Sequence, residues 1–233
     1  QPRLLVVTVA VVLMAAMQIA WGLKFGGIGG IGGNAFAYSV WSSGTAAVTA
    51  DSIKAAAVGG SGGTGAKGVS YAASNGGNGG TGGNAFAYGV RGSEQALLTL
   101  TVDSIAAEAA AGTGGAGGSK GSYGGSSGVD GSAGGQGAQA EAYGVYADSG
   151  SVITLSAKTN GGTITIGAKA SNTETQKGSK AYAVYADNAT VLFNDKAVLN
   201  SDGSSTDNDV ITYLNNATFG FGSPGEGQRG PHY

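Results

Sequence analysis

The sequence predicts an all-β fold, a right-handed parallel β-solenoid (β-helix) with glycine-rich turns, preceded by an N-terminal hydrophobic helix. Three observations support this prediction: a short phrase that recurs four times, stretches in which apolar and polar residues alternate, and glycine tracts with a period of three. A repeat of about 20 to 50 residues is typical of solenoids, because each unit buries its apolar face only against its neighbours. We therefore expect one repeat domain over residues 25–222, between a signal peptide or anchor helix at 1–24 and a disordered tail at 223–233.

The N-terminal segment is strongly apolar. Residues 4–21 read LLVVTVAVVLMAAMQIAW, with Arg3 before them and Lys24 after them. A helix of this length, rising about 1.5 Å per residue, approaches the roughly 30 Å hydrocarbon core of a bilayer. Three interpretations are open: a cleaved export signal, a retained membrane anchor, and a hydrophobic element of the folded domain. The first two place the rest of the chain outside the cytoplasm, and the anchor would associate with a membrane through residues 4–21.

The recurring phrase has the form Ala-x-Ala-Tyr-x-Val. It occupies residues 34–40, 84–90, 139–145 and, more loosely, 178–184, and its tyrosines are separated by gaps of 50, 55 and 39 residues: Tyr38, Tyr88, Tyr143 and Tyr182. Because successive strand residues point to opposite faces, each tyrosine should share a face with the valine two positions later. We expect both positions to form ladders in the core. The position two before each tyrosine should face outward: Phe36, Phe86, Glu141 and Lys180. The alternative is that the tyrosine marks a turn.

A second set of stretches alternates between apolar and polar residues, as half-buried strands do. They occupy residues 48–55, 100–107, 151–157 and 163–168, and residues 210–214 read as a final strand. After the N-terminal segment, only the alanines of residues 106–111 favour a helix locally.

Between these stretches lie glycine tracts at residues 26–33, 59–65, 76–83 and 112–118. Their period of three matches the polyproline II helix, and glycine at two of three positions would let such helices approach one another closely. The alternative is a set of flexible linkers. Ordered tracts would absorb the unequal spacing of the phrases.

Composition excludes several classes of function. The chain has 47 glycines, no cysteine, only 12 Lys plus Arg and a net charge of −2, so nothing indicates a nucleic-acid partner. A single histidine, His232, falls in the predicted tail, which excludes a Ser/His/Asp triad or a zinc site within the fold. We therefore expect no catalytic activity and assign no catalytic, cofactor-binding or metal residue, and no cofactor.

Carboxylates are the only candidates for site chemistry. Asp148 and Asp187 occupy equivalent places in two repeats and could share a cation or act on a glycosidic bond, although an aspartate that opens a turn is the commoner case. Asp51 and Asp103 read as turn or strand-edge residues. The acidic loop at 202–209 could hold calcium or simply be hydrated, and it lacks the spacing of the known calcium-loop motifs.

The later repeats resemble a known class of proteins. The phrases YGVYAD at 143–148 and YAVYAD at 182–187, followed by SVITL and ATVLF, resemble passenger regions of bacterial autotransporter-like surface proteins, over roughly residues 34–220. This resemblance implies a parallel β-helix that is displayed on, or shed from, the cell surface as an adhesin. The tracts at 26–35 and 76–85 also look like glycine-rich repeats of mycobacterial surface proteins.

We therefore expect a non-catalytic, exported surface repeat protein, adhesin-like or structural, located extracellularly or on the cell surface, with host or matrix glycans or proteins as partners. One alternative is an extracellular fibre subunit that self-associates and retains its hydrophobic N-terminus. A weaker alternative is an ice-binding solenoid, based on two Thr-x-Thr pairs at 99–101 and 163–165.

Overall fold

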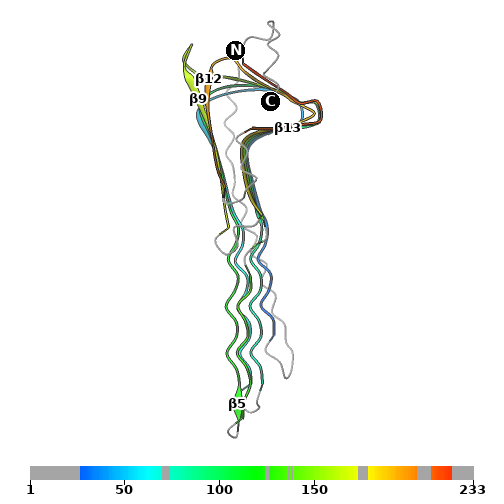
Figure 1. The fold of residues 1–233 in the computed structure, drawn as a ribbon, viewed down its shortest axis with the longest axis vertical. Helices are drawn as coiled ribbons and strands as arrows, with labels where there is room; N and C mark the ends of the chain where they lie inside the picture. The colour runs from blue at the N-terminus through cyan, green and yellow to red at the C-terminus, as the bar shows by residue number, and fades with distance from the viewer. Residues whose placement is uncertain are drawn as a thin grey trace.

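The computed structural model describes residues 27–69, 74–123, 126–135, 137, 139–172, 178–203 and 211–221. These residues form an all-β structure without a helix, in which strands at one end continue into long wavy tracts (Figure 1). The strands are β1 (Ala35–Ser42), β2 (Thr45–Val58), β3 (Ala85–Gly92), β4 (Leu97–Ala110), β5 (Ser122–Tyr123), β6 (Ser126–Ser127), β7 (Ala140–Asp148), β8 (Val152–Ser156), β9 (Thr163–Ser171), β10 (Ser179–Asp187), β11 (Thr190–Phe193), β12 (Lys196–Gly203), β13 (Ile211–Leu214) and β14 (Thr218–Phe221).

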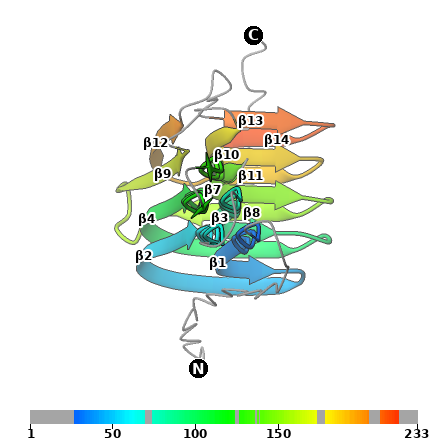
Figure 2. The same cartoon turned by 90° about the horizontal axis from the view of Figure 1, so that it is seen from below.

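The four phrases lie side by side on parallel strands. The sheet that they form has the order β1-β3-β7-β10-β13, and its register places each tyrosine opposite the next, as in the pairs Tyr38–Tyr88 and Tyr143–Tyr182. The strands at the two ends of this stack are β1 and β13 (Figure 2). The prediction of repeated, parallel strands is therefore confirmed.

The alternating stretches form a second parallel sheet. It contains β12, β9, β4, β8, β11 and β14 in this order, and β2 pairs along β4. Residues 97–101 of β4 pair with β8, whereas residues 104–110 pair with β9. The two shorter strands β8 and β9 therefore lie one after the other along the same long strand. The predicted strands at 48–55, 100–107 and 163–168 are present within β2, β4 and β9. The one predicted at 151–157 is present as β8, which is shorter by one residue at each end. The alanines at 106–110 are part of β4, because alternate residues there face an alanine-rich core.

Two apolar cores fill the space between the sheets. The larger core contains Leu, Ile, Val and Phe side chains from every repeat, and its members include Leu98, Leu100, Ile153, Ile166 and Phe193. The smaller core consists of alanines, such as Ala87, Ala107 and Ala142. Because alanine is so small, the two sheets approach each other more closely there, next to the glycine tracts.

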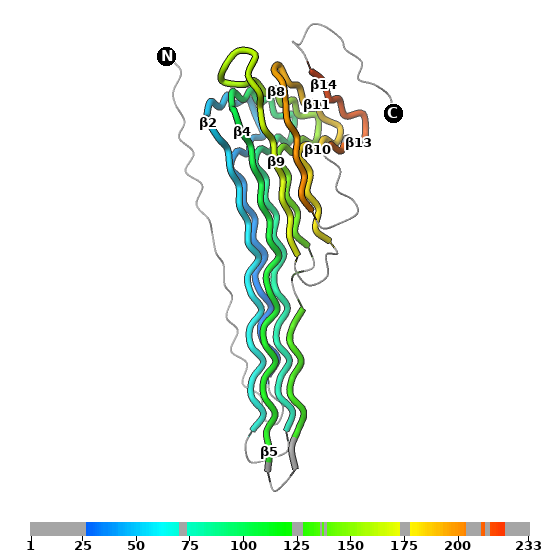
Figure 3. The backbone as a smooth tube through the Cα atoms, turned by 60° about the vertical axis from the view of Figure 1, so that its left-hand side comes forward, coloured from blue at the N-terminus to red at the C-terminus, as the bar shows by residue number. Residues whose placement is uncertain are grey.

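The glycine tracts are ordered and form a two-layered stem. Residues 27–34 and 74–84 lead into β1 and β3, and the described residues 128–135, 137 and 139 precede β7, whereas residues 59–69 and 111–121 leave β2 and β4 (Figure 3). Backbone hydrogen bonds join the tracts at every third residue, for example Gly77, Gly80 and Gly83 N–H donating to carbonyls of residues 66, 63 and 60 at 2.8 Å. The period of three therefore reflects tracts that are packed and hydrogen-bonded to one another and not flexible linkers.

Within the described ranges, no helix is long and apolar enough to span a bilayer. The predicted helix at 1–24, Val210 and the predicted tail at 223–233 with His232 lie outside the described residues. The rest of the predicted final strand is present as β13 (Ile211–Leu214).

Candidate functional site

The strands of the phrase bend directly after the tyrosine. Gly89 and Val90 are both buried, and a Cβ on Gly89 would lie 2.6 Å from the side chain of Ile105, so two consecutive residues face the core. The pairing between β3 and β7 is interrupted at this point: Tyr88 and Val90 have partners in β7, but Gly89 has none. The extra inward residue reverses the alternation of the strand.

The prediction that tyrosine and valine share the core face is therefore wrong. The valines belong to the larger core, whereas the tyrosines lie on the outer face with the residues two positions before them, as the 2.7 Å hydrogen bond from Tyr143 Oη to Glu141 Oε2 shows. The outward direction of the position two before each tyrosine is as predicted, with Phe36 58% exposed.

The predicted ladder of tyrosines is present on this outer face. Neighbouring rings are stacked, with centroids 4.9 Å apart for Tyr38–Tyr88, 5.0 Å for Tyr88–Tyr143 and 5.3 Å for Tyr143–Tyr182. A parallel row begins with Phe36 stacked on Phe86 at 4.9 Å. These spacings follow from the distance between neighbouring strands, which is about 4.8 Å.

A second row of bulky side chains lies three residues after the tyrosines, across the bend. Its members are Trp41, Arg91, Tyr146 and Tyr185. The rings of the two rows meet edge to face, as between Tyr143 and Tyr146 at 5.0 Å and 83°. Sequence analysis missed this row. A signal was present, because the position three after every tyrosine of the phrase carries a large side chain.

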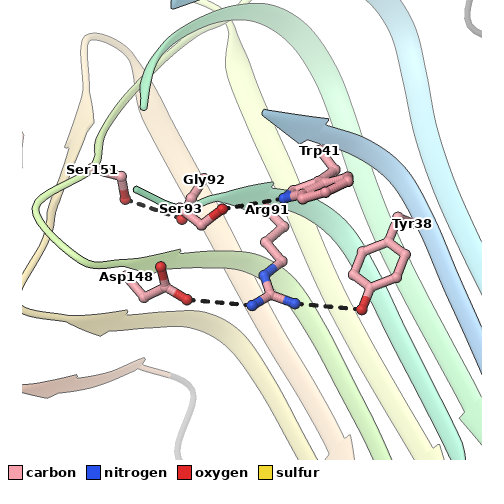
Figure 4. A network of polar contacts seen from close by, with 7 residues as sticks. All are labelled: Tyr38, Trp41, Arg91, Gly92, Ser93, Asp148 and Ser151. Atoms are coloured by element: carbon pink, nitrogen blue, oxygen red, sulfur yellow. Dashed lines mark hydrogen bonds and ion pairs between the residues drawn. The ribbon is translucent and has the colours of Figure 1, made fainter. Parts of the chain in front are cut away.

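Arg91 occupies the centre of this aromatic surface (Figure 4). Its guanidinium carbon lies 5.3 Å from the ring centroid of Tyr88 and 5.2 Å from that of Tyr146, within the range of cation–π contacts. Its Nη2 is 3.5 Å from Asp148 Oδ2, and its Nη1 donates a long 3.4 Å hydrogen bond to the hydroxyl of Tyr38. Trp41 Nε1 donates to Ser93 Oγ at 3.2 Å, which fixes the indole beside the arginine.

Burial within the two rows changes the acidity of the tyrosines. Desolvation, with a further contribution from Tyr38, raises the pKa of Tyr88 to about 12. Desolvation and the hydrogen bond to Glu141 also raise the pKa of Tyr143. Both phenols therefore stay neutral well above physiological pH, and Tyr143 keeps the proton that it donates to Glu141.

The surface is most open at its β1 end. Tyr143 and Tyr182 are only 7% and 8% exposed, whereas Phe36 and Trp41 are 58% and 65% exposed. The interior of the ladder thus stiffens the bend, and the rings that a partner could contact directly belong mainly to the first repeat.

The predicted pair of carboxylates is adjacent but already engaged. Asp148 and Asp187 are partners in the register of β7 and β10. Asp148 faces Arg91, and Asp187 Oδ1 accepts a 2.7 Å hydrogen bond from Asn215. Such partners match structural carboxylates better than a pair of catalytic acids.

Other acidic candidates pair with lysines. Lys158 forms an ion pair with Asp51, and its backbone N–H donates to Asp103 at 3.1 Å. Both aspartates lie inside strands, β2 and β4, so the prediction of a turn role is wrong. Asp202, at the start of the acidic loop, pairs with Lys169 at 3.2 Å. Most of that loop, residues 204–209, lies outside the described residues. Among the residues that are described, no cluster of three or more potential metal ligands occurs.

The Thr-x-Thr pairs do not extend into regular ladders. Thr99 is opposite Thr154 but also Ala47, and Thr165 is opposite Ser104 and Val198. Mixed columns of this kind give no uniform threonine face.

The aromatic surface with Arg91 is thus the candidate site, and it suits binding more than catalysis. Comparison with protein-family models, with curated proteins and with solved structures gives no match for this chain.

Proposed function

We propose that this chain is a non-catalytic, exported repeat protein of the cell surface, adhesin-like, which binds glycans through the aromatic surface. In this proposal the stacked strands form a right-handed parallel β-solenoid, and the segment at 4–21 is the export signal or anchor. The observation that supports the proposal is that two rings of the first repeat, Phe36 and Trp41, are 58% and 65% exposed. They lie on either side of the bend, next to Tyr38, whose ring Arg91 contacts.

The chemistry of this surface favours sugars. Exposed aromatic faces are apolar and rigid, and they pack well against the C–H faces of pyranose rings at a low cost in side-chain entropy. Arg91 and the hydroxyls of Tyr38 and Tyr88 lie beside them and can hydrogen-bond sugar hydroxyls. Because the exposed rings belong mainly to the first repeat, a glycan would bind at this end of the stack, against Phe36 and Trp41.

The stem fits a role in display. Its hydrogen-bonded tracts extend away from the strands (Figure 1). The aromatic residues belong to the strands that directly follow these tracts, such as β1 and β3, so the aromatic surface adjoins the stem. The resemblance to autotransporter passengers and the apolar segment at 4–21 support the surface location.

Binding of the full chain to immobilised glycans, mucin and matrix proteins tests this proposal. We expect glycan binding that Trp41→Ala and Phe36→Ala each weaken by about tenfold, which corresponds to about 1.4 kcal/mol. Val58→Ala is the matched control, because Val58 is also 64% exposed but lies on β2, outside the aromatic rows. Absence of glycan binding, binding to matrix proteins alone, or equal loss in the control would contradict the proposal.

A further inference from the structure

The first repeat leaves its inward-facing apolar residues partly exposed. Val40, Ala46 and Val48 pack against the larger core but are only partly buried. Their counterparts one repeat later, Val90, Leu98 and Leu100, are 0% exposed. The difference arises because β1 and β2 have a strand partner on one side only among the described residues. This end of the stack therefore presents both unpaired backbone groups and core side chains.

The last repeat has the same property at the opposite end (Figure 2). Ile211 of β13 and Phe219 of β14 are partly buried, and Phe221 is 48% exposed. Their counterparts in the preceding repeat, Val184, Val191 and Phe193, are 0% exposed.

The two ends are complementary in size along the same inward columns. One column runs through Ala46, Leu98, Ile153, Val191 and Phe219, and the next runs through Val48, Leu100, Leu155, Phe193 and Phe221. Each column thus begins with a small residue and ends with a phenylalanine. A phenylalanine that protrudes at one end would fill the space above the small residue at the other end.

We infer that a second copy of this chain binds head to tail, with its β1 and the start of its β2 stacked on β13 and β14 of the first copy. The contact continues the parallel register of the molecule and places Val40 on Ile211, Ala46 on Phe219 and Val48 on Phe221. It joins two different surfaces, so it leaves a free end on each copy and propagates into filaments. This self-association goes beyond glycan binding and does not depend on it.

Cysteine cross-linking tests the contact directly, because the chain contains no cysteine. Thr45 and Thr218 are the first and last residues of one outward-facing column, and both are exposed. In the proposed contact they lie on adjacent strands, about 4.8 Å apart, whereas within one copy four strand steps, about 19 Å, separate them. A disulfide needs Cα atoms within about 7 Å.

We expect the full chain with Thr45→Cys and Thr218→Cys to give a ladder of disulfide-linked dimers, trimers and larger species after mild oxidation. The control with Thr45→Cys alone should give no such ladder. Dimers from that control would instead show pairing of two first repeats and would overturn the head-to-tail arrangement. Absence of cross-links in the double variant would also overturn the inference. That result would occur if residues of the same chain covered one of the two ends.

A mixing experiment separates the two ends. Val48→Lys should block the first repeat and Phe219→Lys the last, so each variant alone should be monomeric in analytical ultracentrifugation, whereas an equimolar mixture should form one-to-one dimers. Ala47→Lys is the matched control, because Ala47 is the exposed neighbour of Val48, and it should associate like the unaltered chain. A mixture that remains monomeric would contradict the inference, and the cross-linking result stands even if a lysine variant fails to fold.

Discussion

At the scale of single residues, the stem depends on glycines, because the backbone of a neighbouring tract occupies the space that a side chain would need. A Cβ built on Gly79, Gly115 or Gly134 would lie 1.9 to 2.0 Å from a carbonyl oxygen of the next tract. Rotation of a side chain cannot relieve such a contact, because the oxygen belongs to the backbone and the position of the Cβ is fixed by the backbone. The tracts repeat as Gly-Gly-x, and the third position, x, is free of this restriction. It carries the exposed side chains, such as Thr64, Thr81 and Thr113.

Two adjacent glycines allow a matched test. Gly134→Ala places a methyl group 2.0 Å from the carbonyl oxygen of Gly80, whereas Gly135 has nothing within 4 Å of its Cβ position. We expect Gly134→Ala to cost about 3 kcal/mol or more through overpacking, and Gly135→Ala to be neutral or slightly stabilising. Urea unfolding of both variants measures the difference. Equal stability would mean that the tracts are not packed at this distance.

The buried phenols predict a loss of stability in alkaline solution. The pKa of Tyr88 is about 12 in the folded chain, against an ordinary value of about 10 in the unfolded chain. The stabilisation is therefore complete below about pH 10 and is lost as the pH rises toward 12, because the unfolded state releases its proton first.

Urea unfolding at a series of alkaline pH values, with tyrosinate absorbance recorded in parallel, measures this effect. Tyr88→Phe should flatten the decline in the free energy of unfolding. Replacement of an exposed ring, Phe36→Tyr, should leave the decline as it is. A decline identical in Tyr88→Phe would assign the alkaline effect to other groups.

At the scale of elements, asparagine side chains complete the hydrogen bonding between tracts. The N–H groups of Ser132 and Val129 donate to Asn78 Oδ1 and Asn75 Oδ1 at 3.0 Å, and Asn84 N–H donates to Asn34 Oδ1 at 2.9 Å. These asparagines occupy exposed third positions, and they accept from backbone N–H groups that make none of the backbone–backbone bonds between tracts. We expect Asn78→Ala to increase the hydrogen-exchange rate of Ser132 N–H by about tenfold, equivalent to about 1.4 kcal/mol, and to leave Gly131 N–H protected.

The stability of the stem should depend more on keeping glycines in register with the neighbouring tracts, the three-residue phase, than on the length of a tract. Deletion of Asn78–Gly80 keeps the order Asn-Gly-Gly-Thr-Gly-Gly in the tract that leads into β3. Deletion of Thr81 alone moves Asn78 into the place of Gly79 and Asn75 into that of Gly76, where a Cβ would lie 1.9 Å from carbonyl oxygens. We therefore expect the single-residue deletion to destabilise the chain more than the three-residue deletion in urea unfolding. The reverse order would show that hydrogen-bond number dominates over phase.

The elements show what the sequence could and could not predict. Alternation and period located the strands and the tracts, because both patterns follow from backbone geometry alone. The face of Tyr88 was mispredicted, since strict alternation assumes no bulge, and the buried pair Gly89–Val90 breaks it. The contacts of Arg91 depend on which side chains the bend brings together, and no local pattern contains this information. Repeated glycine before the valine, at 89 and 144, was the one local hint of a bend.

At the scale of the whole molecule, stability comes from stacking, so equivalent residues differ according to their place in the stack. Each valine of the phrase faces the same core, but Val90, Val145 and Val184 are 0% exposed whereas Val40 is only partly buried. Repeats of this kind gain most of their stability from contacts with both neighbours. A substitution in a middle repeat therefore weakens contacts with two neighbouring repeats, and a substitution in the first repeat weakens contacts with one.

This difference gives a comparison of two chemically identical substitutions. Val145→Ala should cost about 2 kcal/mol or more, at about 0.8 kcal/mol for each buried methylene-sized group plus the cavity left behind, and Val40→Ala should cost about half as much. Thermal unfolding at low protein concentration measures both. At high concentration the cost of Val40→Ala should rise toward that of Val145→Ala, because a second copy stacked on the first repeat would bury Val40 as completely as β3 buries Val145. A cost of Val40→Ala that does not depend on concentration, in a chain that associates, would place the contact between copies elsewhere.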